Sequence, residues 1–272
     1  PRSTPAFCSP PTRRVRDALP LFEQLVAEAP GEPRYAMNLA QCYYNSGRYT
    51  MARQVLDGII AAEPANASAR VHLGAALFAE GKLEEASAVL EQAERDFPGR
   101  TDLDTILGTI YIYLRRWDGA ERVFTRAAAA DPHEPRAHHG LALVAIGRGK
   151  HEQAVDHCLR ALELRHFYPD AHYSLGVALT WMKDFDHAIK SFNVALSMQP
   201  GLIDAHRYLA SIHRHLGDGR NAPIHRDMAL HFINQRSRGE AGHDQLRREA
   251  PMWPQEWLAH IGQSDDDRAA PD

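Results

Sequence analysis

Histidine is a common metal ligand, and its spacing in this sequence argues against a metal site on one helix. The chain of 272 residues has sixteen histidines. A metal site on one helix needs two histidines three or four positions apart, so that both rings lie on the same face. No pair has that spacing; His206 and His213 share a face but lie two turns apart. We therefore expect surface or groove histidines, and neither a metal nor another cofactor.

Other chemical patterns are incomplete. The Gly-Arg-Gly-Lys stretch at 147–150 lacks the first glycine and the Ser or Thr of a phosphate-binding loop, so we interpret it as a turn. The glycosylation sequon at 66–68 is short enough to arise by chance. Cys8, Cys42 and Cys158 are odd in number and form no Cys-x-x-Cys pair, which favours buried thiols in a reducing compartment. No local context supports a Ser/His/Asp or Cys/His arrangement, so we expect no enzyme activity from this chain.

Charge and hydropathy exclude two classes of partner. Lys and Arg number 31 against 35 Asp and Glu, a formal net charge of −4, so we expect no nucleic-acid partner. No apolar run approaches the roughly 20 residues of a membrane span, and we expect no membrane partner. No signal peptide opens the chain, which favours a cytoplasmic location. The chain starts at Pro1 rather than Met, so we expect a processed or partial product whose export signal could be missing.

A repeat of 34 residues organises most of the chain. Position 7 of each unit is Leu, position 8 is Gly or Ala, and position 20 is Ala, counting the units as 33–66, 67–100, 101–134, 135–168, 169–202 and 203–236. Positions 4, 7, 8 and 11 fall on one face of a helix, and positions 20, 24 and 27 fall on one face of a second helix. Small residues at positions 8 and 20 let the two helices approach closely. A unit is thus a helix pair that needs its neighbours to bury its apolar face.

These units resemble the tetratricopeptide repeat family. The copy that matches the family pattern best carries Leu107, Gly108, Tyr111, Ala120, Phe124, Ala127 and Pro132. The resemblance implies an all-α, right-handed superhelical solenoid of tetratricopeptide helix pairs over 33–236. The sixth unit departs from the pattern, because His213 takes the Tyr place and Arg226 the Phe place.

The segments outside the repeats have their own expected roles. Residues 12–32 match the second half of a unit, so we expect a half repeat or a capping helix there. Residues 251–262 carry Trp253, Trp257, Leu258 and Ile261, an apolar stripe suited to a C-terminal capping helix, with the groove as an alternative place for it. The remaining expectations are a disordered leader at 1–11, a polar linker at 237–250 and an acidic tail at 263–272.

The resemblance also implies where a partner binds. In the family, free positions of the first helices line a concave groove that holds a peptide or a helix. Carried over by position, the expected peptide-binding residues are Asn38, Gln41, Tyr44, Asn45, His72, Phe78, Thr109, Ile112, Tyr113, His139, Leu143, Tyr173, Val177, Trp181, Arg207 and Arg214. Position 5 of the first three units holds Met37, Val71 and Thr105, so the carboxylate clamp of chaperone-binding members is missing. A groove filled by the protein's own flanking segments remains an alternative.

Two functions therefore stay open. The first is a scaffold that binds a protein or peptide partner. The second follows from residues 165–179, which resemble the repeat tails of bacterial phosphodiesterase and alkaline-phosphatase-superfamily proteins. In that case the chain is the non-catalytic part of a metal-dependent enzyme, and a covalently linked catalytic domain lies upstream.

Overall fold

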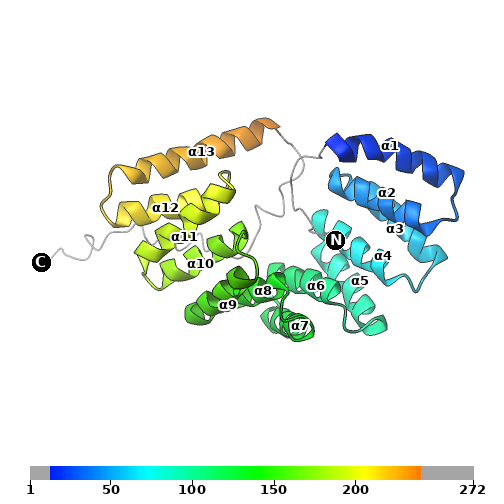
Figure 1. Cartoon of the computed structure of the whole chain (residues 1–272), viewed down its shortest axis with the longest axis horizontal. Helices are drawn as coiled ribbons and strands as arrows, with labels where there is room; N and C mark the ends of the chain where they lie inside the picture. Colours follow the sequence, from blue (N-terminus) through cyan, green and yellow to red (C-terminus); the bar gives the residue numbers. More distant parts are fainter. Residues whose placement is uncertain (1–12, 240–272) are drawn as a thin grey trace, which may run out of the picture. The chain divides into compact units, whose positions relative to one another are not determined.

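The computed structural model describes residues 13–239, which form helices and no strand. The chain divides into two compact units, one ending at Ile110 and the other starting at Tyr111. The helices, shown in Figure 1, are α1 (Arg13–Glu28), α2 (Pro33–Asn45), α3 (Tyr49–Ala62), α4 (Ala67–Ala79), α5 (Leu83–Asp96), α6 (Thr101–Tyr113), α7 (Trp117–Ala130), α8 (Pro135–Gly147), α9 (His151–Leu164), α10 (Pro169–Trp181), α11 (Phe185–Met198), α12 (Ile203–His215) and α13 (Asn221–Gly239).

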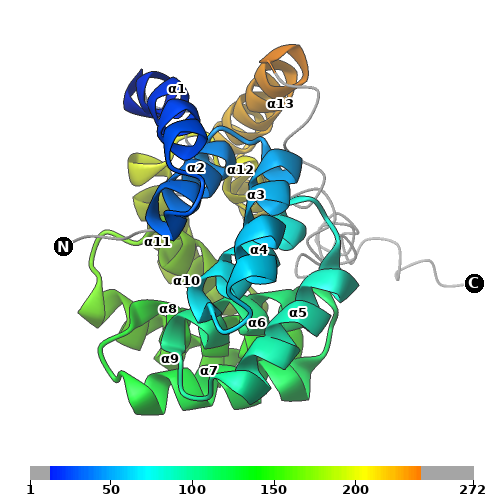
Figure 2. The same cartoon turned by 90° about the vertical axis from the view of Figure 1, so that its right-hand side faces the viewer.

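Within each unit, helices that follow one another in the chain pack together. The contacts run from α1 to α5 in the first unit and from α7 to α13 in the second. Figures 1 and 2 show these successive helices running back and forth, joined by short turns. The expected fold class, an all-α solenoid of helix pairs, is confirmed.

The turn inside each pair requires a left-handed backbone. Four of these turns use a glycine, and φ is +77° at Gly47 and +82° at Gly81. Arg115 and Lys183 occupy the same place in two other pairs, with φ of +54° and +62°. A side chain at positive φ crowds its own backbone, so these two turns carry strain that the glycine turns avoid. The tight packing on both sides of each turn must hold them in place.

Small residues at positions 8 and 20 bring the two helices of a pair into contact, as the repeat pattern predicts. The position-20 alanines of the first five units have no exposed surface, while Ala222 of the sixth is half-buried. A methyl group added to Gly176 would lie 2.8 to 2.9 Å from ring carbons of Phe192. Gly74 stands in the same way against Leu90. The bulky residue at position 24 therefore fills the space that the missing side chain at position 8 leaves open.

Replacing Gly176 with alanine tests this close approach. Helix propensity alone would favour alanine by about 1 kcal/mol, whereas overpacking against Phe192 costs about 1–3 kcal/mol. We expect Gly176→Ala to lower the melting temperature measured by circular dichroism. Gly58 is the matched control, because it lies inside α3 with no atom near a built side chain, so Gly58→Ala should raise it. Equal shifts in the same direction would contradict the packing account.

The helix α1 covers the first complete pair. Leu19, Phe22 and Val26 pack against a cluster formed by Leu39, Tyr43 and Ala52. The hydroxyl of Tyr43 also donates a 2.8 Å hydrogen bond to Glu23. A half repeat and a capping helix would both bury this face, so both roles remain proposals.

The ends of the described region differ slightly from the expected boundaries. The last helix, α13, runs to Gly239, three residues beyond the expected end of the repeats at 236. The expected leader at 1–11, capping helix at 251–262 and acidic tail at 263–272 lie outside the described residues. So do residues 240–250 of the expected linker.

Two cysteines lie in the cores of the units, as their positions on apolar stripes predict. Cys42 is buried in the first unit, and Cys158 has no exposed surface in the second. Burial raises the pKa of the Cys158 thiol to about 12 and also raises the pKa of Cys42. A thiol with a raised pKa is a poor nucleophile, so both cysteines act as small apolar side chains.

Candidate binding face

The residues expected to bind a peptide lie on the first helices of the pairs, and we call their shared side the first-helix face. In the first unit it is built from α2, α4 and α6 as far as Ile110. In the second unit it is built from α8, α10 and α12, where α10 contacts both of its neighbours. The second unit therefore presents side chains from first helices of successive repeats beside one another.

The first unit places polar side chains on this face. Asn38 and Asn45 are exposed on α2, and Gln41 donates a 2.9 Å hydrogen bond from Nε2 to Oδ1 of Asn45. Tyr44 is half-buried and packs edge-on against Tyr49, with ring centroids 5.3 Å apart. This end offers amides and one aromatic ring.

Four of the expected contact residues are buried in the cores instead. Phe78 is 5% exposed, Ile112 is 2% exposed and Val177 has no exposed surface. Tyr173 packs on Phe192 at 5.7 Å and belongs to the core of the second unit. Tyr173 also contacts Tyr208 of the next repeat, at 6.2 Å between ring centroids. A ligand would reach these side chains only by displacing that packing.

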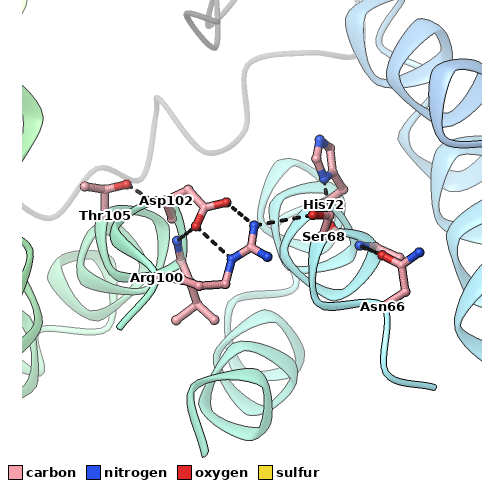
Figure 3. A network of polar contacts seen from close by, with 8 residues as sticks. Asn66, Ser68, His72, Arg100, Asp102 and Thr105 are labelled. Carbon is pink, nitrogen blue, oxygen red and sulfur yellow. Dashed lines mark hydrogen bonds and ion pairs between the residues drawn. The ribbon is translucent and has the colours of Figure 1, made fainter. Parts of the chain in front are cut away.

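A network of polar contacts in the first unit joins α4 to the start of α6 (Figure 3). The guanidinium of Arg100 binds both oxygens of Asp102, with Nε 3.0 Å from Oδ1 and Nη2 2.7 Å from Oδ2. The same Nη2 lies 3.4 Å from the hydroxyl of Ser68 on α4. Farther along α6, Thr109 is half-buried and donates to the carbonyl of Thr105. The network ties the loop before α6 to the neighbouring repeat.

Charge in this network is already balanced. Burial acts to raise the pKa of Asp102, but the hydrogen bonds and charge of Arg100 and the backbone N–H of Leu103 outweigh it, so that pKa is lowered. The hydrogen bond to Asp102 raises the pKa of Arg100. His72 donates from Nδ1 to the carbonyl of Ser68 at 2.7 Å, which leaves its Nε2 as an acceptor. We interpret the cluster as structural, with His72 as a polar group at its edge.

The second unit holds a part-buried chain of polar groups between α8 and α10. Nε2 of His139 lies 2.9 Å from the hydroxyl of Ser174, and its Nδ1 lies 3.1 Å from the hydroxyl of Tyr168. Burial lowers the pKa of His139 against the opposing charge of Asp170, so its ring stays neutral at neutral pH. The partner that orients the ring is a phenol and not a carboxylate, and Ser174 is 1% exposed. The contact therefore suits helix packing better than nucleophilic catalysis.

Removing the Tyr168 hydroxyl tests this structural role. In Tyr168→Phe, Nδ1 of His139 loses its partner in a buried place, which costs about 1–3 kcal/mol. We expect a lower free energy of unfolding in urea. Phe167 is the control next to it, because its side chain is 76% exposed and Phe167→Ala should change stability by less than about 0.5 kcal/mol. Equal effects of the two substitutions would contradict the assignment.

The remaining expected residues of the second unit are accessible to different degrees. Trp181 is half-buried and stacks on His151, with ring centroids 5.3 Å apart and nearly parallel planes. Leu143 and Tyr113 are also half-buried. Arg207 and Arg214 are exposed on α12, where Arg207 lies 3.3 Å from Asp204. An aromatic ring and two cations thus remain on the first-helix face outside the fully buried core.

The burial of His206 differs from what the sequence predicts for the histidines. His206 was expected at the surface or in the groove, but it is 5% exposed. It lies between α12 and α13 beside His225, a residue that the search along single helices could not connect to it. Among the described residues, no group of three or more His, Cys, Asp or Glu side chains could hold a metal ion. None of the described helices is long and apolar enough to cross a membrane.

Comparison with family models identifies the helix pairs. The model described as "Anaphase-promoting complex, cyclosome, subunit 3" matches residues 12–93. The model described as "Tetratricopeptide repeat" matches residues 107–169. Together they cover parts of both units.

Two curated relatives are similar over much of the chain. The "DnaJ homolog subfamily C member 3 homolog" of Dictyostelium discoideum is 22% identical over 209 residues, which cover 69% of this chain and 41% of that protein. The "Probable UDP-N-acetylglucosamine--peptide N-acetylglucosaminyltransferase SPINDLY" of Hordeum vulgare is 25% identical over 172 residues, covering 61% and 18%. The chain therefore spans less than half the length of these relatives. Both come from eukaryotes, so they do not support the bacterial affinity suggested by the second resemblance.

Solved structures show the same arrangement of helix pairs. The structure titled "Crystal structure of APC/C hetero-tetramer Cut9-Hcn1" has a TM-score of 0.75 at 20% identity, covering 87% of this chain and 46% of that one. The structure titled "Crystal structure of YrrB: a TPR protein with an unusual peptide-binding site" has a TM-score of 0.51 at 20% identity, covering 68% and 95%. The chain is therefore a solenoid-type helical repeat protein. With the matching family models and the repeated pattern in its sequence, it belongs to the tetratricopeptide repeat family.

Proposed function

We propose that this chain is a scaffold that binds a protein or peptide partner on its first-helix face. One observation carries the proposal: Trp181, Arg207 and Arg214 stay outside the fully buried core on adjacent first helices, although the helices around them are tightly packed. Tryptophan and arginine are the residue types that contribute most to binding energy in protein interfaces. The YrrB structure, which its title describes as having an unusual peptide-binding site, gives a precedent for peptide binding within this fold.

The proposed ligand carries an apolar side chain beside acidic groups. Trp181 gives a flat surface for the apolar group, while Arg207 and Arg214 stand seven residues apart, two turns along the same side of α12. Arginine pairs well with carboxylates because its planar fork matches both oxygens. A short amphipathic helix or an extended acidic peptide would satisfy both features.

The second function suggested by the sequence, part of a metal-dependent phosphodiesterase or phosphatase, gains no support from the matched families. Neither matching model describes such an enzyme. Ser174, which lies against His139, is buried, and the charge of Arg100 is paired with that of Asp102. We propose that the chain does not itself catalyse a reaction.

Photocrosslinking followed by titration tests the scaffold proposal. A benzoylphenylalanine placed at Trp181 should capture a ligand that the same group at Leu159, an exposed residue on the second helix α9, does not capture. A synthetic peptide from the captured protein should then bind the purified chain. Trp181→Ala should weaken this binding about thirtyfold, which corresponds to about 2 kcal/mol for a central aromatic contact.

The control for the titration is Leu159→Ala, which should leave the affinity unchanged. Arg207→Ala together with Arg214→Ala should weaken binding more at low salt than at high salt, because exposed charges are screened. Unchanged affinity in both the Trp181 variant and the double arginine variant would remove the first-helix face of the second unit as the binding surface.

A further inference from the structure

The last helix pair, α12 and α13, is packed differently from the others. In the first five units position 24 is a buried side chain: Leu56, Leu90, Phe124, Cys158 or Phe192. In the sixth unit that position is Arg226, whose side chain is 66% exposed and pairs with Asp227. Another group must therefore fill the contact between α12 and α13.

Four aromatic rings fill it, alternating between the two helices, and we call them the ring stack. His213 of α12 lies parallel to His225 of α13, with centroids 5.6 Å apart. His225 lies 5.3 Å from His206 of α12, and His206 stacks at 5.8 Å on Phe232 of α13. Three of the four rings can take up a proton, so this helix contact is titratable.

The hydrogen bonds within the ring stack define which nitrogens carry protons when the rings are neutral. Nε2 of His206 lies 3.1 Å from the carbonyl of Pro200, which can only accept, so Nε2 carries the proton. Nδ1 of His206 is then an acceptor, and it lies 3.0 Å from Nδ1 of His225. His225 must donate this bond. The neutral pair is therefore fully matched, with one proton between the two facing nitrogens.

One added proton can be accommodated, but two cannot. If His206 is protonated, its Nδ1 becomes a donor, and His225 can accept only by moving its own proton to Nε2. If His225 is protonated as well, two N–H groups on two cations face each other at 3.0 Å. Like charges at that separation repel strongly, and both rings lose their mutual hydrogen bond.

The carboxylates near the ring stack do not balance a positive charge on His206 or His225. Asp218, in the turn between the helices, lies 3.1 Å from His213. Asp204 of α12 pairs with Arg207, and Asp227 of α13 pairs with Arg226. The neighbouring helices α11 and α10 add aromatic contacts, from Phe185 to His215 and from Tyr173 to Tyr208. Within the described part of the chain, no carboxylate forms an ion pair with His206 or His225.

We propose that the α12–α13 pair is an acid-sensitive switch, in which proton uptake by His206 and His225 releases α13 from α12. At neutral pH His206 and His225 are neutral and the pair is closed. At acidic pH the second proton breaks the hydrogen bond between His206 and His225 and makes the two rings repel each other, and α13 detaches. The α10–α11 pair stays closed, because the ring of Phe192 fills the space beside Gly176.

The direction of the pH effect follows from the histidine pKa values. Burial lowers the pKa of His225 to about 4, helped by His206 and His213. Burial also lowers the pKa of His206, against the carbonyl of Pro200. A histidine in the detached state titrates near 6.5. The closed pair thus binds fewer protons than the open one, so its stability is complete above about pH 6.5 and falls as the pH drops from there towards 4.

Hydrogen–deuterium exchange on the full chain tests the switch. Exchange at pH 7.5 and pH 5.0, corrected for the intrinsic effect of pH on amide exchange, is compared for α13 and for α10 and α11. We expect protection of α13 to fall about tenfold or more at pH 5.0, since one proton can contribute up to a factor of ten per pH unit. Protection of α10 and α11 should change by much less. Equal changes in all three helices, or no change in α13, would overturn the proposal.

Two variants separate the ring stack from general acid sensitivity. His225→Asn keeps an N–H donor near the position of Nδ1 but cannot be protonated at neutral or mildly acidic pH, so the pH dependence of α13 protection should largely disappear. His231→Asn is the control, because His231 is exposed on the same helix and should leave the pH dependence intact. A pH dependence that survives in His225→Asn would contradict the switch.

If His225→Asn does not fold, a nuclear magnetic resonance titration of the wild-type imidazoles decides the question. The switch requires a His225 resonance that titrates with a midpoint well below 6.5, the value of an unperturbed histidine. A midpoint near 6.5 for His225 would overturn the proposal. This inference does not depend on the proposed partner, because every measurement is made on the free chain.

Discussion

The fold depends on one constraint, that no helix pair can bury its own apolar face. In pairs such as α4–α5 and α10–α11, a glycine at position 8 admits the large side chain at position 24, as Gly176 admits Phe192. The outer side of each pair then needs the next pair, and the contact between Tyr173 and Tyr208 joins two successive repeats in this way. Stability in such an array is approximately a sum over pairs and their neighbours. The proposed binding surface is the part of the first helices that remains exposed after this packing.

Much of the architecture could be predicted from the sequence because the repeat pattern is local. The six left-handed turns, the buried alanines at position 20 and the buried cysteines all follow from spacing within 34 residues. The positive φ of Arg115 and Lys183 also follows from their position in the repeat, although neither residue is a glycine. The division of the described chain into two compact units inside α6 was not predicted, and the repeat pattern contains no signal for it.

The binding face could be predicted only in part. The position of a residue in a helix predicts on which face of the helix its side chain lies. It does not predict whether residues of the next repeat cover that face. Val177 and Tyr173 therefore lie in the core, whereas Arg207 and Arg214 on the next first helix remain exposed. The contact between His206 and His225 was missed for a related reason. It joins two helices, and a search for histidines spaced along one helix cannot detect it.

The repeat arrangement also determines how far a local change in the sixth unit can spread. Because α13 contacts α12 and belongs to the last described pair, it can detach while the tightly filled pair of α10 and α11, with its Gly176–Phe192 contact, stays closed. Stability in a repeat array is local, so we expect heat to open α13 at a lower temperature than α10 and α11. The polar residues of the sixth repeat thus confine opening to α13, which can refold onto α12 while the packed contacts of α10 and α11 remain in place.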